Sequence, residues 1–149
     1  MNYQKFLLFL TLILTNPYLI PTAKAESSQI CTFTTTEPGD LVRSGQPRPT
    51  KFVTFADAGG TPVQMEITCQ EPARLSVSAP IQLSGPELNL VVSETIITTT
   101  TGATTKTGDT PLLLPVGTTG VTVNMVIDRG QRLRAGSYRF TFKLNFMPQ

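Results

Sequence analysis

The 149-residue sequence predicts an all-β fold built from antiparallel sheets. Apolar and polar residues alternate with a period of two along several stretches, which is typical of strands with one buried and one solvated face. Turn-forming groups rich in Gly and Pro recur roughly every 8–12 residues, the spacing expected of a sandwich or a barrel. No stretch beyond the first 25 residues shows a helical period, and most prolines lie at turns, where they oppose helices.

Residues 1–25 have the pattern of a secretory signal peptide. Lys5 precedes an apolar run, FLLFLTLIL (6–14), and a small-x-small cleavage site ends at Ala25. A membrane anchor is the weaker interpretation, because the run is far shorter than the ~20 residues of a spanning helix. We therefore expect export to the periplasm, the cell surface or the medium, with residues 26–149 forming a single β-sandwich domain.

Charge gives no indication of a nucleic-acid or anionic-membrane partner. The net charge of +2 comes from two lysines within the signal peptide, so residues 26–149 carry ten basic and ten acidic residues and a net charge of zero. Nucleic acids and anionic membranes favour a clustered basic face. Four arginines crowd the C-terminal quarter: Arg129, Arg132, Arg134 and Arg139. We expect them on a solvated turn and strand edge, with Asp128 beside them.

The first half of the exported part contributes four expected strands. Phe33 has the same parity as Cys31, so both side chains should point inward. Every second residue is apolar in VQMEITC (63–69) and in ARLSVSA (73–79). The expected strands lie near 30–35, 51–56, 63–70 and 73–79.

The second half contributes four more strands. VTVNMVI (121–127) alternates, and YRFTFKLNF (138–146) alternates most clearly, with five large apolar residues on one side. A strand loaded in this way belongs at a core, and we expect it to pair with an early strand. The expected strands lie near 88–98, 111–115, 119–128 and 137–147.

A threonine-rich segment, IITTTTGATTKTGDTP (96–111), lies between two strand-like stretches. Threonine favours strands, and Gly102 and Gly108 allow the chain to reverse, so we expect an exposed hairpin arm with little to bury. A loose loop and a functional surface, such as an ice-binding threonine array, are the alternatives.

Cys31 and Cys69 are the two cysteines of the chain. In an exported protein they most simply form one buried intramolecular disulfide, a staple across the core. A metal pair or a redox pair is a poor interpretation, because the chain has no His and no C-x-x-C motif.

The sequence offers no catalytic, cofactor-binding or metal-binding residues. Hydrolytic triads that need His are excluded, and no cysteine is expected to be free as a nucleophile. The nucleophile-elbow, phosphate-loop, dinucleotide-binding and calcium-loop patterns do not occur. We therefore expect a protein that is not an enzyme and carries no cofactor.

Two stretches resemble the immunoglobulin-like subunits of the pilin and spore-coat-U group. They are CTFTTTEPGDLV…VQMEITCQEPARLSVSAP around the cysteine pair and LRAGSYRFTFKLNFMP at the end. The resemblance implies an exported immunoglobulin-like β-sandwich with an early-strand disulfide. Only ESSQI precedes Cys31 after the cleavage site, which is short for the donor strand that such subunits usually carry.

The expected function is that of a structural or adhesive subunit in the periplasm or at the surface. Its expected contact mode is the addition of a partner's strand at a sheet edge. A secreted carbohydrate-binding β-sandwich is the alternative, although Trp is absent and the C-terminal aromatic residues fit a core. A small secreted enzyme with scattered carboxylates has no positive feature to support it.

Overall fold

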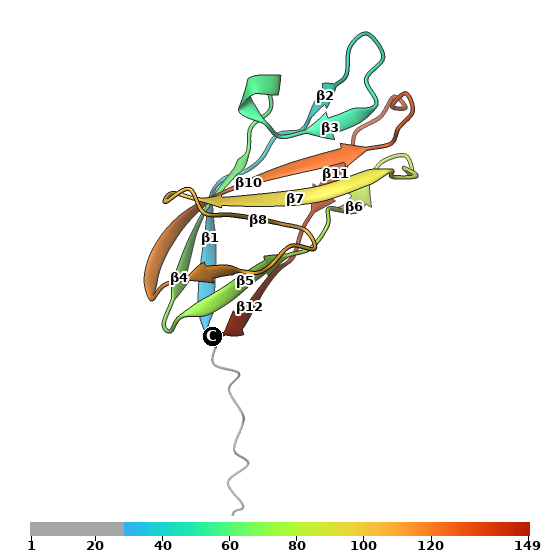
Figure 1. Ribbon diagram of the computed structural model, residues 1–149. Helices are drawn as coiled ribbons and strands as arrows, with labels where there is room; N and C mark the ends of the chain where they lie inside the picture. The colour runs from blue at the N-terminus through green and yellow to red at the C-terminus, as the bar shows by residue number, and fades with distance from the viewer. Residues whose placement is uncertain (1–28) are drawn as a thin grey trace, which may run out of the picture.

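The computed structural model describes residues 29–149 and forms an antiparallel β-sandwich with a single short 3₁₀ turn, η1 (Ala56–Ala58), in that part of the chain (Figure 1). The predicted signal peptide, residues 1–25, lies outside the described residues. The strands are β1 (Cys31–Glu37), β2 (Val42–Ser44), β3 (Lys51–Val53), β4 (Val63–Cys69), β5 (Ala73–Val77), β6 (Ile81–Ser84), β7 (Val92–Thr99), β8 (Thr104–Lys106), β9 (Leu112–Leu114), β10 (Gly117–Asp128), β11 (Arg139–Thr141) and β12 (Leu144–Pro148).

The long strand β10 lies at the centre of the larger sheet. One of its edges pairs with β4 along its first half and with β3 along its second half, and its other edge pairs with β7. β1 and β2 continue the sheet beyond β4 and β3, and β8 continues it beyond β7. All pairings are antiparallel, as the sequence predicted.

The connection between β3 and β4 leaves the sheet and returns to it along the same edge of β10. Val53 is paired with Val126 and Val63 is paired with Val123, so β3 and β4 lie end to end along this edge. At the return point Gly60 lies against Thr54, where a Cβ atom would come within 2.8 Å of the Thr54 backbone. Only glycine permits this close approach.

The second layer is smaller and consists of two short ladders. β5 pairs with β12 on one edge and with β9 on the other, and β6 pairs with β11. The C-terminal strands therefore do pair with an earlier segment, as expected. β12 and β11 form one outer edge of this layer, and β9 and β6 form the other.

Apolar residues from both layers fill the space between them. The larger cluster joins residues of β4, β7 and β10 to residues of β5 and β9, and the smaller one surrounds Ile127 beneath the loops at the opposite end. This packing of two sheets confirms the predicted sandwich. The most deeply buried large side chains are Ile67, Leu75, Ile97, Leu114 and Ile127.

The C-terminal segment differs from the single strand expected near 137–147. It is interrupted at Phe142 and Lys143, between β11 and β12. There the Ser78 hydroxyl accepts a hydrogen bond from the Lys143 N–H (2.9 Å), and the Ser78 N–H donates to the Lys143 carbonyl (3.0 Å). A side chain thus replaces part of the ladder. The apolar side of this segment is only half-buried, because β11 and β12 form an edge.

Two short strands, β2 and β6, were not expected from the sequence, and β8 was expected only as part of the threonine-rich hairpin. Each has three or four residues and a mixed burial pattern, so no alternation marks them. Residues 88–91, expected to open the strand at 88–98, lie outside β7. Among residues 29–149 no helix is long and apolar enough to span a membrane.

The threonine-rich segment forms the predicted hairpin, with β7 and β8 as its arms. Gly102 lies in the turn with φ +87°, a left-handed conformation that glycine adopts readily. The expectation that it buries little was wrong. Thr99 and Thr105 are buried, and the Thr105 hydroxyl donates to the Thr110 carbonyl (2.9 Å). The threonines of this segment favour the strand conformation, and the buried Thr105 hydroxyl still has a hydrogen-bond partner.

Candidate functional site: the open flank between β1 and β12

Cys31 and Cys69 form the predicted disulfide, and both are buried. They lie directly opposite each other in the β1–β4 ladder, with Cα atoms 4.1 Å apart. The expectation of a staple across the core was therefore wrong, because the bond joins neighbouring strands of one sheet. It fixes the edge strand β1 to the inner strand β4.

The backbone of β1 presents free hydrogen-bonding groups along its outer edge. The Gln70 N–H donates to the Ile30 carbonyl, so positions 30, 32 and 34 form the hydrogen-bonded pairs of the ladder. The short Cα distance at Cys31 agrees with a pair that is not hydrogen-bonded. The N–H and C=O groups of Cys31, Phe33 and Thr35 thus point away from β4, toward the open edge.

The same argument identifies the free groups of β12. The Ser78 N–H donates to the Lys143 carbonyl and the Gln149 N–H donates to the Pro72 carbonyl, so odd-numbered positions face β5. The backbone groups of Leu144 and Phe146 therefore face outward. Pro148, which has no N–H, lies on this outer edge, where proline is tolerated.

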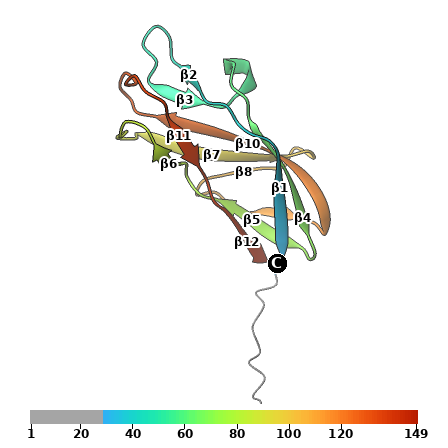
Figure 2. The same cartoon turned by 180° about the vertical axis from the view of Figure 1, so that it is seen from behind.

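These two free edges border the same side of the sandwich, which we call the open flank: β1, the connection 38–41, β11 and β12. Figures 1 and 2 show the beginning of β1 beside the end of β12. The rings of Phe33 and Phe146 lie between the two strands, with centroids 6.5 Å apart. Phe33 is 50% exposed, although it is on the inward face as predicted. Other half-buried apolar side chains, Ile30, Phe142 and Leu144, pack against the core nearby.

The upper part of the open flank contains a hollow of about 170 Å³. Met125 of the central strand contributes to its lining, together with residues of the 38–41 connection and of β11. Because β1 leads up to the 38–41 connection and β11 leads down to β12, the two borders run in opposite directions. The lining residues are Gly39, Asp40, Leu41, Met125, Tyr138, Arg139 and Phe140.

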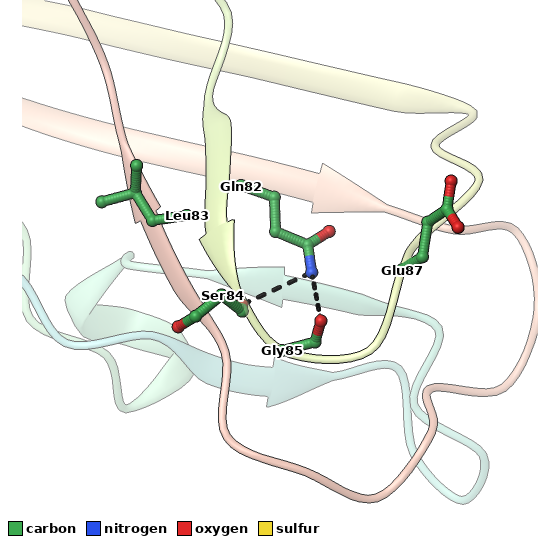
Figure 3. Close-up of a pocket in the computed structure, with 5 residues that line it drawn as sticks. All are labelled: Gln82, Leu83, Ser84, Gly85 and Glu87. Carbon is green, nitrogen blue, oxygen red and sulfur yellow. Dashed lines mark hydrogen bonds between the residues drawn. The ribbon is translucent and has the colours of Figure 1, made fainter.

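A larger hollow, of about 300 Å³, follows the bend after β6 (Figure 3). The Gln82 amide nitrogen lies against three carbonyls of this bend, those of Ser84 (3.4 Å), Gly85 (3.2 Å) and Pro86 (2.9 Å). The amide is thus occupied in holding the bend, and Glu87 is the only charged residue in the lining. The open flank, with its free backbone groups and apolar side chains, offers more to a ligand.

Residues 29–149 contain no group of three or more His, Cys, Asp and Glu residues placed to hold a metal ion, and no free cysteine. The sequence identified Cys31 and Cys69 and predicted a contact at a sheet edge, but it did not show that β1 and β12 would border one open flank. The alternating C-terminal segment was the sequence feature that belongs to this flank. Its apolar side predicted burial, but the pattern did not show that this segment would lack a neighbouring strand on one edge. Comparisons with protein-family models, curated proteins and solved structures found no match.

Proposed function

We propose that this chain is an exported, non-enzymatic structural or adhesive subunit, which accepts an extended segment of a protein partner at the open flank. The observation that carries the proposal is the position of two free strand edges on either side of exposed apolar side chains. Main-chain groups at Cys31, Phe33 and Thr35 on one border and at Leu144 and Phe146 on the other can bind an added strand.

The chemistry of the open flank favours a strand with apolar residues at alternate positions. Such residues would cover Phe33 and Phe146 and fill the hollow beside Leu41 and Phe140. Burial of exposed apolar surface contributes roughly 25 cal/mol per Å², and main-chain bonds fix the register. Because the two borders run in opposite directions, the added strand would be antiparallel to one and parallel to the other.

Export is supported by the signal-peptide pattern of residues 1–25 and is compatible with the disulfide. The non-enzymatic character is supported by the absence of His from the sequence and by the pairing of both cysteines. The resemblance to pilin and spore-coat-U subunits agrees with a structural role. Mass spectrometry of the exported protein should find Glu26 at the new N-terminus.

Amide hydrogen exchange tests strand addition at the open flank. In the isolated protein, the amides of Phe33, Thr35, Leu144 and Phe146 should exchange fast, because they face solvent. In complexes isolated from the native cell envelope they should become protected, whereas the exposed bend at Gly85 should not change. Complexes in which these four amides still exchange fast would refute the proposal.

A charge substitution provides the second arm of this test. Phe33→Asp should prevent recovery of the complex, since it places a carboxylate in the apolar part of the open flank. Val116→Asp is the matched control, because Val116 is similarly exposed (60%) and lies in the turn between β9 and β10, outside β1 and β12. Thermal melts of both variants should stay near that of the unmodified protein, since each replaces an exposed side chain.

A further inference from the structure

Two loops at one end of the sandwich bring most of the basic residues together. The β2–β3 hairpin and the loop between β10 and β11 lie side by side at this end (Figures 1 and 2). We call the segments 43–51 and 128–139 the basic tip. It contains seven of the ten basic residues of the described chain: Arg43, Arg48, Lys51, Arg129, Arg132, Arg134 and Arg139.

The charge of the basic tip is not balanced locally. Its seven basic residues face one acidic residue within the two segments, Asp128, so the segments carry a net charge of +6. The rest of residues 29–149 has three basic and eight acidic residues, a net charge of −5. The near-zero total therefore conceals a strong separation of charge.

The basic groups of the tip are also free of ion pairs. The one ion pair found among residues 29–149 joins Lys106 to Glu94, outside the tip. The Asp128 carboxylate accepts a hydrogen bond from the Gly130 N–H (2.7 Å) and so serves the turn of its own loop. Five of the seven basic side chains are exposed and two, Lys51 and Arg129, are half-buried.

Backbone contacts hold the two loops together despite this repulsion. The Arg129 N–H donates to the Thr50 carbonyl (3.0 Å), and the Leu133 N–H donates to the Pro49 carbonyl (2.9 Å). Leu133 is buried (7% exposed) and anchors the longer loop in the smaller core cluster. The Arg129 guanidinium donates to the Arg132 carbonyl (2.7 Å). The tip is thus a supported platform that keeps basic groups without ion pairs close together, and such a concentration of one charge attracts ligands of the opposite charge.

We propose that the basic tip binds an acidic polysaccharide, a linear sugar polymer bearing carboxylates. The guanidinium fork of arginine matches a carboxylate in two parallel hydrogen bonds, and six of the seven basic residues are arginines. Gln46 and Gln131, exposed in the same two loops, offer hydrogen bonds to sugar hydroxyls. The proposal relies on export, but not on strand addition at the open flank.

Other polyanions suit the basic tip less well. Membrane attachment favours many apolar side chains beside the basic ones. Leu133 is buried, and the exposed apolar side chains next to Asp128 are two valines, Val91 and Val92. Single-stranded nucleic acids favour exposed aromatic rings for base stacking, and the one ring in the tip, Tyr138, packs on Phe52 with centroids 4.7 Å apart. Export separates the chain from duplex nucleic acid inside the cell.

Affinity electrophoresis of the full exported chain tests the proposal. The protein should be retarded in gels containing polygalacturonate and not in gels containing neutral dextran. Because the contacts are charged and exposed, retardation should disappear at about 0.5 M salt. No retardation, or equal retardation by neutral dextran, would overturn the proposal. So would tighter binding of duplex DNA, or of phosphatidylglycerol vesicles, measured separately by sedimentation.

A pair of charge-matched variants locates the binding surface. The tip variant Arg48→Gln/Arg132→Gln/Arg134→Gln removes three exposed charges and should weaken polygalacturonate binding on the order of tenfold. The control removes three charges elsewhere and should change binding less than about twofold. Equal weakening by both variants would show that net charge, and not the tip, controls binding. The control variant is Arg74→Gln/Lys106→Gln/Lys143→Gln.

Discussion

Replacing Thr95 by valine should stabilise the fold, although most substitutions of buried residues destabilise. Thr95 is fully buried on β7, and its hydroxyl makes no hydrogen bond within the described chain. Its backbone is bonded independently to Thr107, whose N–H donates to the Thr95 carbonyl (3.0 Å). Valine has nearly the same shape, so the substitution leaves these backbone bonds intact.

The expected gain combines two effects of this environment. A buried hydroxyl without a partner costs roughly 1–3 kcal/mol, and the new methyl group adds up to about 0.8 kcal/mol of apolar burial. Taking the lower half of this combined range, we expect a net gain of about 1–2 kcal/mol. In a domain of this size, that gain should raise Tm by about 4–8 °C.

Thr54 provides the matched control, because it is also fully buried. Its hydroxyl accepts a hydrogen bond from the Met125 N–H (2.8 Å) and donates to the Asn124 side-chain oxygen (3.1 Å). Thr54→Val leaves both partners unsatisfied and should destabilise by about 1–3 kcal/mol. Urea denaturation of the two variants gives both values. A loss of stability in Thr95→Val similar to that in Thr54→Val would refute the assignment of Thr95 as an unsatisfied group.

Three further predictions concern the disulfide and the C-terminal strands. The disulfide closes a separation of 38 residues, so Cys31→Ala/Cys69→Ala should lower the free energy of unfolding by about 4 kcal/mol, measured by urea denaturation against the oxidised protein. Deleting residues 135–149 removes β11, β12 and four aromatic rings that cover both core clusters, and a thermal melt should show no cooperative transition. A cooperative melt near the intact value would instead make these strands a dispensable arm. Arg139→Ser and Lys143→Ser replace exposed side chains, and each should change stability by only about 0.5 kcal/mol.

Alternation predicted the strands whose two faces differ most. β4, β5 and β10 bury every second side chain, and their positions agree with expectation to within one or two residues. The disulfide followed from the cysteine count and the compartment. β2, β6 and β8 are too short for a periodic signal. The break between β11 and β12 was not predictable either, because the Ser78 hydroxyl interrupts the ladder while the apolar pattern of the C-terminal segment continues unchanged.

The candidate sites depend on contacts between segments far apart in the chain, and these were not predictable. The basic tip exists because Arg129 and Leu133 bond to Thr50 and Pro49, which holds the two basic loops against each other. In the sequence, the C-terminal arginines were separated from the earlier basic residues and indicated only a solvated turn. The open flank likewise was not predictable, because it depends on β1 and β12 being edge strands of two different sheets.

The central position of β10 has a consequence for the order of folding. Its partners β3 and β4 precede it by some fifty residues or more, so the larger sheet cannot close until most of the chain is available. The β1–β4 ladder contains only early residues, and its disulfide can form before β10 is available. The oxidised ladder would then serve as the template on which β10 nucleates the sandwich. Reducing conditions should therefore lower the folding rate by a larger factor than they raise the unfolding rate.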